Sequence, residues 1–153
     1  MNFNIHAQQN ENIQTGTVTL TIQPMCEIIV DLPNSPIHFT CNRKWQHRTK
    51  HVQVISNCKW TLRVRPKNRY LYCYQYTIDG NLITYQIVNT KGEGEIHSPE
   101  SEYQLFQRPY NPPFGKGNIE FDILFSLDTE KIWLKRWGNY NTKVDITCTP
   151  DTN

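Results

Sequence analysis

The sequence predicts an all-β protein whose strands form a two-sheet antiparallel sandwich of the immunoglobulin-like or jelly-roll kind. Val, Ile, Thr and aromatic residues, which favour strands, are abundant, whereas long runs of Ala, Leu and Glu are absent. Apolar and polar residues alternate in about ten short segments, and turn residues separate these segments at intervals of roughly ten residues. Such spacing is typical of sandwiches and barrels.

The chain of 153 residues divides into an N-terminal extension, 1–16, and a sandwich domain, 17–150. In the extension, Phe3, Ile5 and Ala7 alternate with polar residues, and the polar stretch 8–16 follows. We expect a short strand that a polar linker separates from the body. A body of this size can bury a core of its own.

The body begins with TVTLTIQ, 17–23, in which Val18, Leu20 and Ile22 face one side and polar residues face the other. This alternation is typical of a half-exposed strand. Pro24 ends it. Two further short strands are expected at CEIIVD and IHFTC, residues 26–31 and 37–41.

The stretch HVQVISNCKWTLRVR, 51–65, has the strongest strand pattern in the chain. Apolar and polar residues alternate on both sides of a polar break at Asn57 and Cys58. We expect two half-buried strands around a tight connection, or one bent strand with a bulge at residues 56–58.

A hairpin is expected next. YLYCYQYT, 70–77, places four tyrosines on one face, and LITYQIV, 82–88, would return as its partner after the Asp79-Gly80 turn signal. The remaining strands are predicted at EYQLFQ, GNIEFDILFSL, EKIWLKRW and KVDITCT, which are residues 102–107, 117–127, 130–137 and 143–149.

The five cysteines are scattered and form no C-x-x-C pair: they are Cys26, Cys41, Cys58, Cys73 and Cys148. This spacing argues against a zinc ribbon or a thioredoxin-like site. In an oxidising compartment two disulfides would leave one cysteine over for a bond between subunits, whereas in a reducing one all would be small core residues. The pairing stays open.

No motif for catalysis or for a cofactor is present, so we expect a non-enzymatic protein without a catalytic residue or cofactor. Glu120 and Asp122 share a strand face, as carboxylates on the wet side of a strand commonly do. His47 and His51 have the H-x3-H spacing of zinc ligands, and Cys41 and Cys58 could be added to them. However, no close cysteine pair accompanies them, and we expect no metal site.

A basic concentration lies in the loop after the third strand and continues into later strands. Its candidate ligand-binding residues for a glycan or an anionic ligand are Arg43, Lys44, Trp45, Arg48 and Tyr72. Nucleic acid is not expected as the partner, because the RNP-type motif is missing. Burial of the aromatic residues between the sheets is the alternative reading.

The segments TVTLTIQP, VQVISNCKWTLRV and WGNYNTKVDITCTP resemble the pattern of secreted β-sandwich subunits of microbial surfaces and fibres, such as pilin-like and TasA-like proteins. In that pattern a Gly-x-Tyr, here Gly138 and Tyr140, leads into the last strand. The resemblance implies an extracellular or cell-surface role that is structural or adhesive. Many cysteines, few glycines and no visible export signal depart from it.

We therefore expect a structural subunit that assembles with copies of itself into a fibre or surface layer. Phe3, Ile5 and Ala7 would form a strand donated to a neighbouring copy, which is how β-strand addition works. The charge distribution suits such contact, because residues 1–76 carry a net +6 and residues 77–153 a net −4. A carbohydrate or anionic-ligand binding module is the alternative, and no membrane span is expected.

Overall fold

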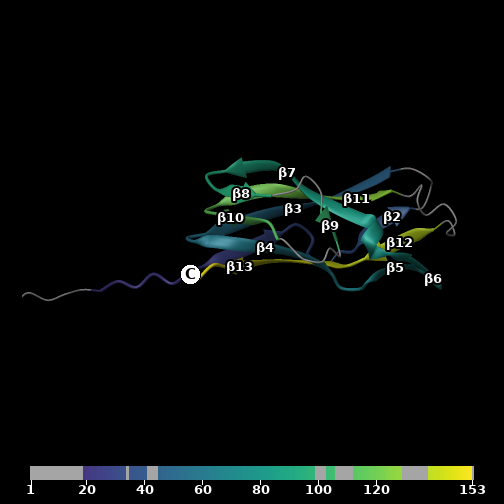
Figure 1. Ribbon diagram of the computed structural model, residues 1–153, viewed down its shortest axis with the longest axis horizontal. Helices are drawn as coiled ribbons and strands as arrows, with labels where there is room; N and C mark the ends of the chain where they lie inside the picture. The colour runs from purple at the N-terminus through teal and green to yellow at the C-terminus, as the bar shows by residue number, and fades with distance from the viewer. Residues whose placement is uncertain are drawn as a thin grey trace, which may run out of the picture.

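The computed structural model describes residues 19–33, 35–40, 45–98, 103–105, 112–128 and 138–152. Within these ranges the strands form three antiparallel sheets, none of them closed into a barrel, and there is no α-helix. The prediction of an all-β, antiparallel protein is confirmed. The strands run along the longest axis of the molecule (Figure 1).

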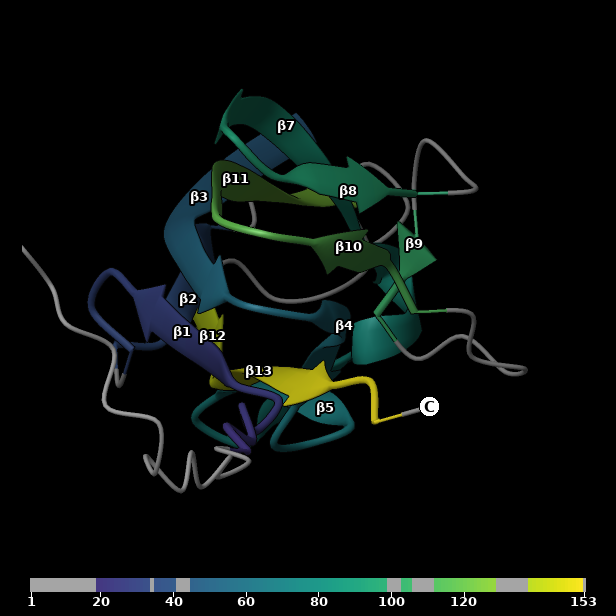
Figure 2. The same ribbon diagram turned by 90° about the vertical axis from the view of Figure 1, so that its left-hand side faces the viewer.

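The first sheet has five strands in the order β1 (Cys26–Val30), β3 (Trp45–Ser56), β11 (Ile119–Asp128), β7 (Ile83–Gly92) and β9 (Tyr103–Gln104). The second has the order β13 (Val144–Pro150), β4 (Lys59–Pro66), β10 (Phe114–Lys116) and β8 (Glu95–His97). The third has the order β2 (Ile37–Thr40), β12 (Asn139–Thr142), β5 (Tyr70–Cys73) and β6 (Tyr76–Asp79). Figure 2 shows β7 and β11 on the opposite side of the molecule from β13 and β5.

The 51–65 stretch forms two strands, and they belong to different sheets. β3 pairs with β1 and β11, whereas β4 pairs with β13 and β10. Only Asn57 and Cys58 connect them. The polar break in the sequence is therefore the point where the chain crosses from the first sheet to the second.

The apolar positions of these strands meet in one core. On β4, Trp60, Leu62 and Val64 are buried, and the residues between them are exposed or half-buried. The Trp60 indole N–H donates to the carbonyl of Gly117 at 3.2 Å. The same cluster contains residues of all three sheets, among them Val52, Val54, Phe121, Phe125, Phe39 and Tyr140.

A Gln46 side chain joins the first sheet to the third. Its carbonyl accepts from the backbone N–H of Thr40 at 2.8 Å, and its amide donates to the Thr40 carbonyl. This is the pattern by which a neighbouring strand would satisfy Thr40. Thr40 in turn pairs with Asn139 of β12.

The predicted hairpin between 70–77 and 82–88 is wrong. Residues 70–79 make their own hairpin, β5 and β6, around a two-residue turn at Tyr74 and Gln75. The Asp79 carboxylate accepts from the Asn81 N–H at 3.0 Å and caps a short 3₁₀ helix, Gly80–Leu82. An Asp-Gly pair can begin a helix with the Asp as its cap, as well as form a hairpin turn. After the short helix, β7 pairs with β11.

The predicted strand at 17–23 is also wrong over its described part. Residues 19–25 belong to no sheet, and the first paired residue is Cys26. Residues 1–18 lie outside the described part of the chain, as does the predicted strand at 130–137.

Candidate functional site

The segment 19–25, which we call the leading segment, is the most exposed apolar element of the described chain. It leads away from the body at one end of the molecule (Figure 1). The Leu20 side chain is 82% exposed and that of Ile22 is 72% exposed. Two large aliphatic side chains so exposed on alternate residues are unusual in a folded chain, because their burial would be favourable by roughly 1.5–3 kcal/mol each.

The polar break between β3 and β4 anchors this segment where it leaves the body. The Asn57 side-chain carbonyl accepts from the Met25 N–H at 2.8 Å, and its amide donates to the Gln23 carbonyl at 3.0 Å. The Ser56 hydroxyl donates to the Met25 carbonyl at 2.8 Å. These bonds fix Gln23 and Met25, so that the apolar residues before them project from a defined position.

A disulfide lies at the next residue. Cys26, the first residue of β1, is bonded to Cys148 of β13, and the two Cα atoms are 6.3 Å apart. The bond connects an edge strand of the first sheet to an edge strand of the second. Cys58 and Cys73 are free thiols, and Cys41 lies outside the described residues. The sequence could not select this pair, because nothing in the spacing of the cysteines indicated that β1 and β13 are neighbours.

One long strand edge has little cover. Of the ten residues of β7, only Thr84 and Tyr85 pair with β9, so residues 86–92 have no strand partner on that side within the described ranges. Unpaired N–H and C=O groups on such an edge are a template for another strand. The uncovered edge is seven residues long, as is the leading segment.

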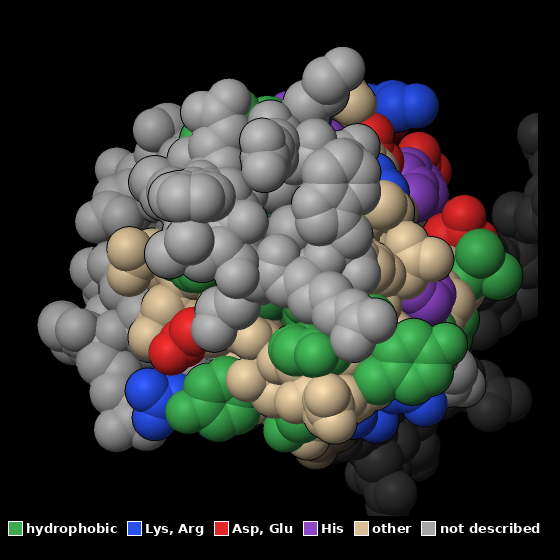
Figure 3. All heavy atoms as spheres, turned by 90° about the vertical axis from the view of Figure 1, so that its right-hand side faces the viewer, with side chains coloured by type: hydrophobic (Ala, Val, Ile, Leu, Met, Phe, Trp, Pro, Cys, Tyr) green, Lys and Arg blue, Asp and Glu red, His purple; other side chains and the backbone are tan. Residues whose placement is uncertain are grey.

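A second candidate site lies at the opposite end of the molecule, where β5 ends and β6 and β12 begin (Figure 1). It is a pocket of about 690 Å³ lined by Tyr72, Cys73, Tyr74, Gln75, Tyr76, Gly138, Asn139 and Asn141. In Figure 3, which faces this end, hydrophobic side chains (green) lie among other side chains and backbone (tan) over the lower part of the view, with Lys and Arg (blue) beside them.

The predicted ligand-binding residues do not all meet there. Tyr72 lines the pocket. Trp45 is half-exposed and stacks on His47, whereas Arg48 lies over the Phe39 ring and lines a separate shallow groove with Asp31 and Lys50. Arg43, Lys44, Phe3, Ile5 and Ala7 lie outside the described residues.

A polar cluster occupies the outer face of the first sheet. Asn89 donates to Asp122 Oδ2 at 2.7 Å, His51 Nδ1 lies 2.9 Å from Asp122 Oδ1, and His51 Nε2 lies 4.0 Å from Glu120. The hydrogen bond from Asn89, followed by that from His51, lowers the pKa of the Asp122 carboxyl below its ordinary value of 3.8. Both oxygens of Asp122 are thus engaged in hydrogen bonds.

Replacing Asn89 by glycine is expected to raise the pKa of Asp122 toward its ordinary value. Asn89 has a φ of 55°, a conformation glycine adopts freely, so Asn89→Gly removes the donor and keeps the backbone. A lowered folded-state pKa means that the carboxylate stabilises the fold above the unfolded-state pKa of about 4, and that this contribution is lost as the pH falls through the folded-state value. Carboxyl ¹³C NMR titration checks this. The control is Thr90→Ala, in which the pKa of Asp122 should stay as in the native chain. An unchanged pKa of Asp122 in Asn89→Gly would contradict the prediction.

In the described part of the chain, no group of three or more His, Cys, Asp or Glu side chains is placed to hold a metal ion. His47, His51 and Cys58, which were considered above as zinc ligands, form no such group there. The described part also has no helix with the length and apolar character needed to cross a bilayer.

Comparison with protein-family models, curated proteins and solved structures gives no match for this chain. The resemblance to pilin-like and TasA-like subunits therefore stays a prediction. The residues that sequence reasoning missed are the asparagines: Asn57 at the anchor, Asn139 and Asn141 at the pocket. A polar residue outside a periodic pattern does not indicate what it binds. The polar break at Asn57 did, however, indicate where the chain crosses between the sheets.

Proposed function

We propose that the protein is a non-enzymatic structural subunit that assembles with copies of itself into a fibre or layer by β-strand addition. The donated strand is the leading segment, whose Leu20 and Ile22 would enter apolar sites of the neighbouring copy. The observation that carries the proposal is the exposure of these two side chains on a segment that has strand periodicity but no strand partner among the described residues. The predicted donor Phe3, Ile5 and Ala7 would lie further along the same extension.

The uncovered edge of β7 is the acceptor that we propose. Main-chain hydrogen bonds along residues 86–92 would supply most of the affinity, and the alternate side chains of the donor would supply the register. Covering the edge would also prevent uncontrolled pairing of the same strand.

We also propose that the sheets form a sandwich of immunoglobulin-like or jelly-roll type and that the protein is extracellular or at the cell surface. Burial of residues from all three sheets in one core supports the sandwich. The Cys26–Cys148 disulfide supports the location, because such bonds persist in oxidising compartments.

Replacing Leu20 and Ile22 together by threonine is expected to abolish self-association and to leave the fold intact. Threonine keeps the strand propensity but removes the apolar area, and both side chains are outside the core. Light scattering coupled to gel filtration should show assemblies of the native chain and a monomer of 18.1 kDa for the variant.

The matched control is Thr19→Ala with Thr21→Ala, which alters the alternate, exposed positions of the same segment. It should assemble as the native chain does. A native chain that stays at 18.1 kDa at all concentrations, or a Leu20/Ile22 variant that still assembles, would rule out the proposed donor.

A carbohydrate-binding module is the second candidate function, and the pocket at the far end favours it. The two functions use opposite ends of the molecule and are compatible with each other.

A further inference from the structure

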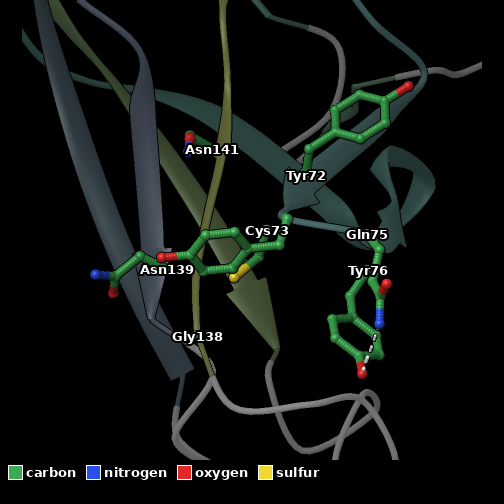
Figure 4. A pocket seen from close by; sticks show the side chains of 8 residues that line it. Tyr72, Cys73, Gln75, Tyr76, Gly138, Asn139 and Asn141 are labelled. Atoms are coloured by element: carbon green, nitrogen blue, oxygen red, sulfur yellow. Dashed lines mark hydrogen bonds between the residues drawn. The ribbon is translucent and has the colours of Figure 1, made fainter.

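The pocket between β12 and the β5–β6 hairpin has the composition of a ligand site. Tyr72, Tyr74 and Tyr76 contribute phenol rings, and Gln75, Asn139 and Asn141 contribute side-chain amides. Figure 4 shows Tyr72 and Tyr76 on β5 and β6 and the two asparagines on β12, with the Asn139 amide turned away from the tyrosines. The volume of the pocket, about 690 Å³, falls within the range of small-molecule sites, roughly 300–1,000 Å³.

The base of the pocket is closely packed. The Cys73 sulfur lies against Gly138 so tightly that a Cβ at position 138 would overlap it. The Gln75 amide donates to the Tyr76 hydroxyl at 3.2 Å (Figure 4). This bond from the turn residue orients the Tyr76 ring. The hairpin and β12 therefore position the residues around the opening.

The lining residues that the structure describes include no Asp, Glu, Lys, Arg or His. An ionised ligand would find no opposite charge among them. Amide groups both donate and accept hydrogen bonds, and phenol rings offer an apolar face beside a hydroxyl. This combination suits a ligand that alternates hydroxyl groups with C–H faces and carries no charge.

Tyr74 is exposed at an energetic cost. It occupies the first position of the two-residue turn with a φ of 53°, and its side chain is 98% exposed. A positive φ at that position alone is the pattern of a type II′ turn, in which glycine is preferred. A bulky residue in this conformation is strained. Such strain is typical of positions retained for binding.

We propose that this pocket binds a neutral oligosaccharide, with Tyr74 and Tyr72 stacking on sugar rings and with Gln75 and Asn141 hydrogen-bonding to their hydroxyl groups. Asn139 has a different role, because its side-chain carbonyl accepts from the Thr40 hydroxyl at 2.9 Å. The inference does not rest on self-assembly, because the leading segment lies at the opposite end of the molecule. It differs from the basic-loop site predicted from the sequence in that its ligand is uncharged and only Tyr72 is shared.

The test is NMR titration of the folded full chain with cellohexaose and chitohexaose, observed at the side-chain amide signals of Gln75 and Asn141. Hexagalacturonic acid serves as the acidic counterpart. We expect saturable shifts of these signals with at least one neutral hexamer and weaker binding of the acidic one. No shift with either neutral hexamer at millimolar concentration, or tighter binding of the acid, would overturn the proposal.

Tyr74→Gly separates binding from stability. Glycine relieves the strained turn, so the unfolding midpoint should stay the same or rise, whereas affinity for the neutral hexamer should fall at least about tenfold. Asn141→Ala should weaken binding as well and provides a second, independent variant. Tyr70→Ala, an exposed tyrosine of the same strand outside the pocket, should bind as the native chain does. Unchanged affinity in both Tyr74→Gly and Asn141→Ala would overturn the assignment.

Discussion

Replacing both Cys26 and Cys148 by alanine is expected to lower the free energy of unfolding by about 4–5 kcal/mol. The two cysteines are 122 residues apart, so their bond closes most of the chain into one loop and removes much of the conformational freedom of the unfolded state. Urea denaturation of the native chain, with and without reductant, and of the double variant measures this loss. The reduced native chain should behave like the variant.

The control is Cys58→Ala, which removes a free thiol near the same end of the molecule. It should cost less than about 1 kcal/mol. If the double cysteine variant unfolds as the control does, the disulfide does not contribute the stability assigned to it here.

The position of this disulfide also bears on assembly. Cys26 follows directly after the leading segment, and Cys148 lies in the second sheet. A pull on the donated strand would therefore reach both sheets through a covalent bond, instead of peeling β1 from β3. Asn57 and Ser56 add hydrogen bonds at the same point.

Replacing Trp60 by alanine is expected to lower the free energy of unfolding by about 3–5 kcal/mol. The Trp60 side chain is almost fully buried, its ring fills the space over Gly115, and its N–H bond to Gly117 ties β4 to the turn after β10. Chemical denaturation followed by circular dichroism measures the change.

Trp45→Ala is the matched control, because the same residue type is half-exposed at the start of β3. Its cost should stay below about 1 kcal/mol. Equal costs for the two tryptophans would show that burial of Trp60 does not contribute the stability assigned to it here.

The periodicity of the sequence predicts much of the fold, because period-two alternation follows directly from burial of one face. β4 shows this most clearly: Trp60, Leu62 and Val64 are buried as their spacing indicates. β11 follows the same rule, with Phe121, Ile123 and Phe125 buried.

The prediction from alternating apolar and polar residues fails where the backbone departs from strand geometry. At Tyr74 a positive φ ends β5 in the middle of an alternating run. Alternation also does not say which strand is the partner: Leu20 and Ile22 have the period of a paired strand, yet no partner lies in the described part of the same chain. The pocket could be predicted only through Tyr72, since β12 and β5 are distant in the sequence and their pairing alone brings Asn141 opposite Tyr72.

The most direct test of strand addition is amide hydrogen exchange of the native chain, compared between dilute and concentrated samples. Strand addition predicts that the amides of residues 19–23 and of residues 86–92 exchange more slowly in the associated sample, because both would become hydrogen-bonded between copies. Association without slower exchange in residues 19–23 would contradict the central claim. Slower exchange there without any change in residues 86–92 would retain the donor and reject β7 as its acceptor.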